Sequence, residues 1–335
     1  MARAKRDAPR LGSVIPTAVS LERIEEARSV IDPVFLDTPQ FRSDALSEAL
    51  GADVVLKVEC LNPVRSFKGR GACYFTHLHK DRAPRPWVCA SAGNFGQGLA
   101  YAARAHGIPL QVFAAETANP LKVARMRSLG AEVRLTGRDF DAAKDASRAF
   151  AAEREATFVE DGRDPAITEG AGTIAIELLH WPGGFDVVLI PLGNGALLNG
   201  IGTWLKAHSP STAVVGVGAS RAPAMERSFR AGKPVSLDEP VATIADGVGT
   251  RVPVPEAVET MLEVADDVLL ADEDSIVSSM RVLFRELGLV VEGAGAVTLA
   301  AATAYKERFR GQRILLLIGG GNADERDVKR YLCGG

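Results

Sequence analysis

Short apolar segments alternate along this chain with longer alanine-rich segments, and this alternation most constrains the fold. Each apolar segment is four or five residues long and nearly continuous. Runs of this length are typical of strands that are covered on both faces, as in parallel sheets. We therefore expect strands at residues 54–58, 87–90, 110–113, 187–190, 214–217 and 314–318.

The alanine-rich segments between these runs are long enough to form helices. We predict helices at residues 98–106, 120–129, 140–154, 169–179 and 274–287. A repeated order of strand, glycine-rich turn and helix is the βαβ unit, so the predicted fold class is α/β. The 335 residues exceed what one hydrophobic core usually serves, and we expect two domains.

Charge and cysteine content exclude several classes of protein. The net charge is −3, so we expect neither nucleic acid nor a membrane surface as partner. No apolar run approaches the roughly 20 residues that span a bilayer, and the basic N-terminus lacks the apolar region of a secretory signal. The four cysteines have no paired spacing, which indicates a reducing compartment. We expect a cytoplasmic protein with no metal site and a mobile tail at residues 1–16.

Glycine clusters follow three of the predicted strands, at residues 91–98, 193–200 and 319–322. Ligands of open α/β sheets bind beyond the carboxyl ends of the strands. In the second cluster, small residues let backbone amides converge before a helix, which predicts a phosphate site. A plain strand-to-helix turn is the alternative. Leu198 occupies the third glycine position of a dinucleotide fingerprint, and no Gly-Lys-Ser/Thr follows as in a Walker A loop.

Lys68 is the candidate reactive residue, in the segment Ser66-Phe-Lys-Gly-Arg-Gly-Ala72. We expect Ser66 to cap a helix and place Lys68 in its first turn. The positive end of a helix disfavours an ammonium group, and burial would favour the neutral amine, which can attack a carbonyl. The alternative is a solvated surface lysine.

Taken in order, the motifs resemble fold-type II pyridoxal-phosphate (PLP) enzymes, and most closely the serine/threonine dehydratase and serine racemase branch. The resemblance runs from about Thr17 to about Asp327. It implies a tryptophan synthase β-like fold with two open, twisted, mostly parallel sheets flanked by helices. It also implies a large domain at residues 1–86 and 163–335 and a small domain at 87–162. The motifs are Ser66–Ala72, Ser91-Ala-Gly-Asn-Phe-Gly-Gln-Gly98, Gly193-Asn-Gly-Ala-Leu197, Ile244-Ala-Asp-Gly-Val248, Glu292-Gly-Ala-Gly-Ala296 and Ile318-Gly-Gly-Gly-Asn322.

The resemblance implies a role for each motif. Lys68 would hold the cofactor, pyridoxal 5′-phosphate, as a Schiff base and later move the Cα proton. Phe67 would lie beside the pyridine ring, Asn94 would bind the 3′-oxygen, and Glu292 would line the pocket near the ring. For Glu292 an exposed turn acid is the alternative. The phosphate would be bound by Gly193, Asn194, Gly195, Ala196 and Leu197. The substrate carboxylate would be bound by Ser91, Ala92, Gly93, Asn94 and Phe95.

Departures from the family pattern refine these expectations. Phe95 replaces the usual histidine and makes the pocket more apolar. Ala92 replaces the second serine of serine racemase, which argues against racemisation. Asn194 and Ala196 replace two glycines of the phosphate loop. Gly319 replaces the polar residue that faces the pyridine nitrogen, and a neutral ring would favour prompt elimination.

Two further differences concern metal binding and regulation. Gly218 and Ala224 stand where serine racemase-like enzymes place acidic metal ligands, so we expect no divalent cation. We also expect the short, catabolic form of a threonine dehydratase, without the regulatory C-terminal domain of the biosynthetic form.

The predicted reaction is α,β-elimination of a β-hydroxy amino acid such as L-threonine or L-serine, which gives a 2-oxo acid and ammonia. Two alternatives stay open. One is β- or γ-replacement by an external nucleophile, as in cysteine and threonine synthases, and the other is a non-catalytic metabolite-binding protein. By resemblance we expect a homodimer or homotetramer whose partner is a small-molecule amino acid.

Overall fold

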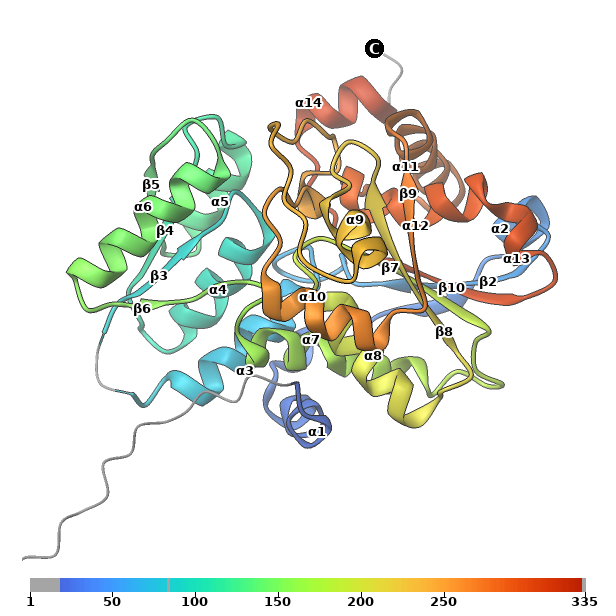
Figure 1. The fold of residues 1–335 in the computed structure, drawn as a ribbon, viewed down its shortest axis with the longest axis horizontal. Helices are drawn as coiled ribbons and strands as arrows, with labels where there is room; N and C mark the ends of the chain where they lie inside the picture. Colours follow the sequence, from blue (N-terminus) through green and yellow to red (C-terminus); the bar gives the residue numbers. More distant parts are fainter. Residues whose placement is uncertain (1–18, 83–84, 333–335) are drawn as a thin grey trace, which may run out of the picture.

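The computed structural model describes residues 19–82 and 85–332 and confirms the α/β class (Figure 1). The expected tail at residues 1–16 lies outside the described residues. A six-stranded sheet has the order β1-β2-β10-β7-β8-β9 and is parallel except for β1, which pairs antiparallel with β2. Its strands are β1 (Gln40–Arg42), β2 (Asp53–Val58), β7 (Val187–Pro191), β8 (Ala213–Ala219), β9 (Asp267–Ala271) and β10 (Arg313–Ile318).

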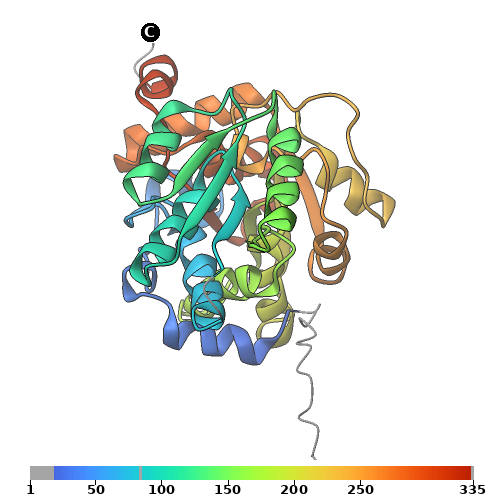
Figure 2. The ribbon, with the colours of Figure 1, turned by 90° about the vertical axis from the view of Figure 1, so that its left-hand side faces the viewer.

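A second, four-stranded sheet comes from one continuous part of the chain. Its order is β5-β4-β3-β6 and all its pairs are parallel. Figure 2 shows this sheet with α6 on one side and α4 and α5 on the other. The strands are β3 (Trp87–Ala90), β4 (Leu110–Ala114), β5 (Glu132–Leu135) and β6 (Thr157–Phe158).

Helices cover both faces of the six-stranded sheet. Side chains of α2, α11 and α12 form one core against it, and those of α7, α8 and α10 form another. Among the described residues, no helix combines the length and apolarity that crossing a membrane requires. The helices are α1 (Leu21–Val30), α2 (Asp44–Leu50), α3 (Lys68–His79), α4 (Asn94–Ala105), α5 (Pro120–Ser128), α6 (Phe140–Glu153), α7 (Pro165–Leu178), α8 (Ala196–His208), α9 (Ala224–Ala231), α10 (Pro255–Val264), α11 (Glu273–Leu287), α12 (Gly293–Ala304), α13 (Lys306–Phe309) and α14 (Glu325–Asp327). The chain also has short 3₁₀ segments at Pro33–Phe35 and Asp246–Val248 and a π turn at Val328–Leu332.

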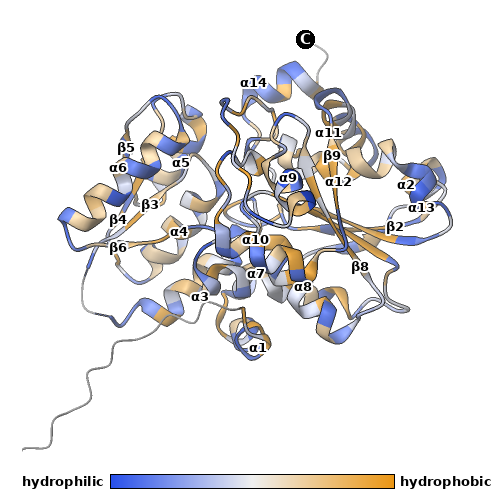
Figure 3. Ribbon diagram, in the orientation of Figure 1, coloured by the Kyte–Doolittle hydropathy of each residue, from blue (hydrophilic) through white to orange (hydrophobic). Residues whose placement is uncertain are grey.

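The central strands are apolar along much of their length, as their orange colour in Figure 3 shows. Successive side chains of a strand point to opposite faces of the sheet. In β2, Val54, Leu56 and Val58 therefore enter one core, and Val55 enters the other. The same two-residue period brings Lys57, which is 1% exposed, into the protein interior, where its amine contacts the Thr38 carbonyl at 2.8 Å and the Glu177 carboxylate.

A buried ion network fixes α3 against its neighbours. Arg70 is fully buried and donates to Glu59 at 2.9 Å, to Glu177 at 2.6 Å and to Thr173 at 3.1 Å. Buried charges are tolerated when they are paired and hydrogen-bonded in this way. The network holds the helix that begins at Lys68 between β2 and α7.

All the predicted strands and helices are present, with bounds that differ by a few residues. The expected cap of α3 was wrong. Phe67, not Ser66, occupies the N-cap position, and the Ser66 hydroxyl is buried with no hydrogen-bond partner among the described residues. Lys68 nevertheless lies in the first turn of α3, as predicted.

Candidate active site

A cavity of about 860 Å³ lies beyond the carboxyl ends of strands from both sheets. This is the edge at which parallel α/β sheets bind their ligands. The cavity brings together all the residues that the sequence singled out for cofactor and substrate. They are Phe67, Lys68, Ser91, Ala92, Gly93, Asn94, Phe95, Gly193, Asn194, Gly195, Ala196, Leu197, Glu292 and Gly319.

An asparagine-centred turn places Lys68 at the cavity wall. The Asn62 side chain accepts from the amides of Val64 and Ser66 and donates to the Glu59 and Ser66 carbonyls. Side-chain bonds of this kind stabilise turns between regular elements. The Phe67 amide then donates to the Gly319 carbonyl at 3.2 Å. The start of α3 is thus tied to the loop that follows β10.

The Lys68 amine points to a carboxylate that the sequence did not single out. Lys68 Nζ donates to Asp161 Oδ2 at 2.6 Å, and both side chains are 13% exposed. The same nitrogen lies 4.6 Å from the centre of the Phe67 ring and 6.0 Å from that of Phe95. Lys68 is therefore not a solvated surface residue. Its amine lies in a partly apolar part of the cavity with one acidic partner.

The turn from Ser91 to Asn94 leads from β3 into α4. The Ser91 hydroxyl oxygen accepts from the Gly93 amide at 3.2 Å and from the Gly96 amide at 2.9 Å. The hydroxyl therefore organises the turn and keeps only its hydrogen for a ligand. The first amides of a helix have no acceptor within the helix, so the start of α4 offers donors to an anion. Phe95 is 5% exposed and belongs to the core as well as to the cavity wall.

The loop at Gly193 to Leu197 joins β7 to the thirteen-residue helix α8. Gly195 occupies the N-cap position with a φ of +97°, a conformation that favours glycine. Asn194 is held by two contacts, since it donates to Asp161 at 3.4 Å and accepts from the Thr250 hydroxyl at 3.1 Å. The loop and the helix dipole together favour a negatively charged ligand.

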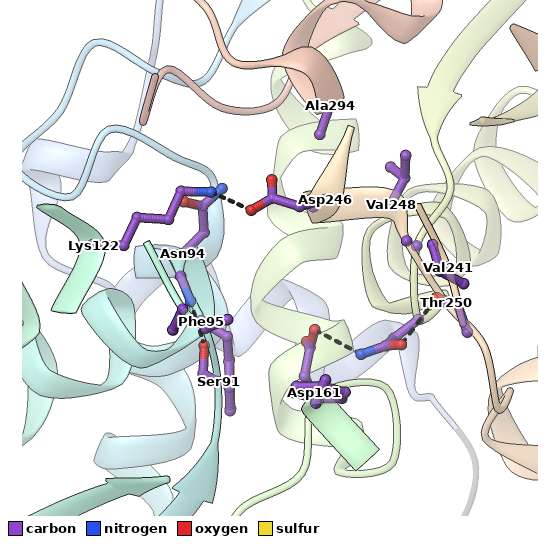
Figure 4. Close-up of a pocket in the computed structure, with 18 of the residues that line it drawn as sticks. Ser91, Asn94, Phe95, Lys122, Asp161, Val241, Asp246, Val248, Thr250 and Ala294 are labelled. Carbon is purple, nitrogen blue, oxygen red and sulfur yellow. Dashed lines mark hydrogen bonds and ion pairs between the residues drawn. The ribbon is translucent and has the colours of Figure 1, made fainter. Parts of the chain in front are cut away.

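Glu292 is the centre of a polar cluster that spans the cavity. It is 4% exposed, so the alternative of an exposed turn acid was wrong. Its Oε1 accepts from the Asn94 amide, and its Oε2 lies 3.3 Å from Lys122 Nζ. Lys122 also donates to Asp246 at 2.7 Å, and Figure 4 shows it reaching across to that residue.

Burial and shared charge set the ionisation of this cluster. Burial raises the pKa of Glu292, and the nearby Asp246 carboxylate raises it further, while Lys122 and the Asn94 amide lower it. Burial by itself lowers the pKa of Lys122, but the Glu292 and Asp246 carboxylates together raise it above its usual value. Glu292 and Asp246 are thus both paired with Lys122, whose raised pKa favours the ammonium form.

Gly319 and Gly320 close the cavity between Phe67 and Glu292. A β-carbon on Gly319 would meet only ordinary contacts, with the Leu317, Phe67 and Pro191 side chains at 3.6 Å. A β-carbon on Gly320 would lie 2.0 Å from Glu292 Oε1. The backbone at Gly320 therefore packs directly against the Glu292 carboxylate.

Sequence reasoning missed several residues of the site. Asp161 follows β6, a two-residue strand that leaves no apolar run to mark it. Lys122 was in no motif, and Asp246 was present in the motif at residues 244–248, but the two are 124 positions apart and no local signal marks their contact. Asn322 was present in the last glycine motif, and its amide donates to Asn94 Oδ1 at 2.8 Å. Within the described part of the chain, His, Cys, Asp and Glu side chains form no group of three suited to a metal ion.

Comparison with known families and sequences gives a consistent result. The family model described as "Pyridoxal-phosphate dependent enzyme" matches residues 31–320. The chain is 34% identical over 315 residues to L-threonine ammonia-lyase of Thermotoga maritima, which covers 94% of this chain and 78% of the relative. It is 33% identical to the catabolic L-threonine dehydratase TdcB of Staphylococcus aureus, over 91% of this chain and 90% of the relative.

Solved structures show the same likeness in three dimensions. The crystal structure of a T.th. threonine deaminase superposes with a TM-score of 0.85 and 36% identity, over 91% of this chain and 99% of the other. Maize serine racemase superposes with a TM-score of 0.87 and 26% identity, over 93% of this chain and 96% of the other.

Proposed function

The chain belongs to the pyridoxal-phosphate dependent enzyme family, and on this basis we propose that it catalyses α,β-elimination of a β-hydroxy amino acid. The default substrates are L-threonine and L-serine, and the products are a 2-oxo acid and ammonia. The observation that carries the proposal is the shared cavity of the Lys68 amine, the Ser91 to Asn94 turn and the glycine loop before α8. Relatives named as threonine ammonia-lyases and dehydratases support this choice over replacement reactions.

The residues of the cavity fit pyridoxal 5′-phosphate. Lys68 supplies a single amine beside the Phe67 ring, which suits an aldehyde on a flat aromatic ring. The loop at Gly193 to Leu197 precedes the N-terminus of α8 and suits a phosphate group. Asn94 supplies an amide that suits the 3′-oxygen, although here it donates to Glu292. When bound, the cofactor supplies an aldehyde for the substrate amine and a ring that withdraws electrons from Cα.

The protein's own residues then orient the substrate and move its protons. The amides at the start of α4 and the Ser91 hydroxyl bind the α-carboxylate, which fixes the Cα–H bond relative to Lys68. Lys68 would hold the cofactor, and its free amine would remove the Cα proton. Phe67 and Phe95 form the apolar wall around the Lys68 amine, which keeps water from it. Apolar surroundings also favour a β-hydroxy amino acid with an apolar side chain.

Domain closure, assembly and location belong to the same proposal. The segment 87–162 would act as a small domain that moves against the rest of the chain and closes over the substrate. Contacts across the cavity, such as Lys122 with Asp246, would hold the closed form. The resemblance to the family supports a homodimer or homotetramer and a cytoplasmic location.

The test is a substrate assay with and without an added nucleophile. We expect 2-oxo acid and ammonia in equal amounts from L-threonine or L-serine when no nucleophile is present. Adding a thiol should not raise the rate of amino-acid consumption. A product that forms only with the thiol would favour β-replacement instead. Lys68→Ala is the control and should release no 2-oxo acid.

A further inference from the structure

The carboxyl group of Asp161 contacts the reactive amine of the cavity directly. Lys68 Nζ donates to its Oδ2 at 2.6 Å, and Asn194 donates to the same oxygen at 3.4 Å. Thr250 holds Asn194 in turn, through a hydrogen bond of 3.1 Å. Figure 4 shows Asp161 and Thr250 joined through the amide between them. The carboxyl group is therefore held in place from the side of the glycine loop.

The second oxygen of Asp161 has no partner. Oδ1 is buried without a hydrogen bond in the described part of the chain, and Asp161 lines the cavity. A buried carboxylate oxygen that lacks a donor costs free energy, so such an atom indicates a group that arrives with a ligand. A hydroxyl group on the substrate would supply that donor.

Three other acids that line the cavity, Glu292, Asp246 and Asp141, are each paired with a cation. Glu292 accepts from Asn94 and is paired with Lys122, which also holds Asp246. Asp141 is paired with Arg251. Among the described residues, Asp161 is the acid within hydrogen-bond distance of the Lys68 amine.

We propose that Asp161 is the acid that protonates the leaving β-hydroxyl group, with a proton that it receives from Lys68. This inference rests on the proposed elimination. Lys68 takes the Cα proton and becomes an ammonium group, which passes a proton to the carboxylate of Asp161. The electron pair of the Cα–H bond forms the Cα–Cβ double bond. The Cβ–O bond breaks with its pair on oxygen, and that oxygen takes the proton from Asp161 and leaves as water. Nothing is oxidised or reduced.

A change of leaving group tests this role. Chloride leaves without a proton, whereas hydroxide does not leave at a useful rate unless it is protonated. We expect Asp161→Asn to lower kcat for L-serine by about 100-fold or more, the usual effect of losing a general acid. The same variant should eliminate chloride from β-chloroalanine at the wild-type rate. The matched control Asp145→Asn, a carboxylate on α6 that is 79% exposed, should leave both rates unchanged.

A second readout shows that the variant is intact. Asp161→Asn should bind the cofactor with the wild-type absorption spectrum, and borohydride should still label Lys68. It should also exchange the Cα proton of L-serine with deuterium from solvent, since Lys68 can still remove that proton. A variant that still exchanges the Cα proton but no longer eliminates water is defective in a step that follows proton removal.

Three outcomes would overturn the proposal. Equal losses with L-serine and β-chloroalanine would make Asp161 a positioning residue for Lys68. Unchanged elimination from L-serine would assign the proton to another donor, such as the cofactor phosphate. A wild-type enzyme that releases 2-oxo acid from neither compound would overturn the proposed elimination itself, a failure that the wild-type assay alone reveals.

Discussion

The Lys122 ammonium lies 3.3 Å from the Glu292 carboxylate and joins α5, beside the four-stranded sheet, to the start of α12, beside the six-stranded sheet. Lys122 and Glu292 are 6% and 5% exposed in their side chains, so this is a buried ion pair across the cavity. The pair links the two layers that form the site.

Removing the lysine should destabilise the protein strongly. Lys122→Met leaves Glu292 buried without its cation, and breaking a buried pair in this way typically costs about 3–5 kcal/mol of unfolding free energy. The double variant Lys122→Met/Glu292→Gln also removes the unpaired carboxylate of Glu292. It should recover most of the lost unfolding free energy. Urea unfolding of both variants measures the difference. Equal unfolding free energies for the single and double variants would show that the pair does not act as a unit.

The adjacent glycines after β10 should respond very differently to alanine. Gly320→Ala puts a methyl group 2.0 Å from Glu292 Oε1, so Glu292 and Asn94 must shift. Overpacking of this kind costs about 1–3 kcal/mol, which corresponds to cofactor binding weaker by about 5- to 150-fold. Gly319→Ala is the matched control, because its methyl group meets only contacts of 3.6 Å. Cofactor titration followed by absorbance checks both, and similar affinities would contradict the packing seen here.

Asp164 should make stability fall as the pH rises. Burial raises its pKa from an ordinary 3.8 to about 6, despite the hydrogen bond that it accepts from the Ala166 amide at the start of α7. Between these two values the folded chain holds a proton that the unfolded chain has released, so this group's stabilising contribution is lost as pH rises from about 4 to 6.

Asp164→Asn keeps the helix cap and removes this ionisation. Between pH 4.5 and pH 7.5, the unfolding free energy of the variant should rise by about 1–2 kcal/mol relative to that of the wild type. This value is reduced because the Asp164 side chain is partly exposed to solvent. Urea unfolding at the two pH values gives the comparison. Asp139→Asn, which alters an N-cap aspartate that is 38% exposed, reports the effect of the same change near solvent. A gain of equal size in both variants would mean that burial of Asp164 is not the cause.

The strands that the sequence predicted and those that it missed differ in their place in the sheets. The six predicted strands are the interior ones, β2, β10, β7 and β8 in one sheet and β3 and β4 in the other. The four that were missed, β1, β9, β5 and β6, are the edges. A strand with neighbours on both sides is buried throughout and has a continuous apolar run. The edge strand Glu132–Leu135 carries charges and has no such run. The edge strand β9 is different, because residues 268–271 do form a short apolar run, and the prediction missed it all the same.

Most of the site residues that the sequence predicted lie just after interior strands, whereas Asp161 and Lys122, which it missed, do not. The glycine clusters of the site follow interior strands, and the carboxyl ends of parallel strands meet at one edge, so the motifs converge on one cavity. Asp161 follows an edge strand, and Lys122 reaches the cavity through a contact distant in sequence. Neither leaves a local pattern, because a tertiary ion pair depends on the packing of whole elements.

Borohydride reduction of the cofactor-saturated protein, followed by peptide mapping, tests the central claim most directly. Lys122 and Lys144 line the same cavity as Lys68, so the chain itself offers competing amines. We expect one labelled peptide, with the reduced cofactor on Lys68 and no label in Lys68→Ala. A label on Lys122, on Lys144 or on any other lysine, or no label at all, would contradict the account.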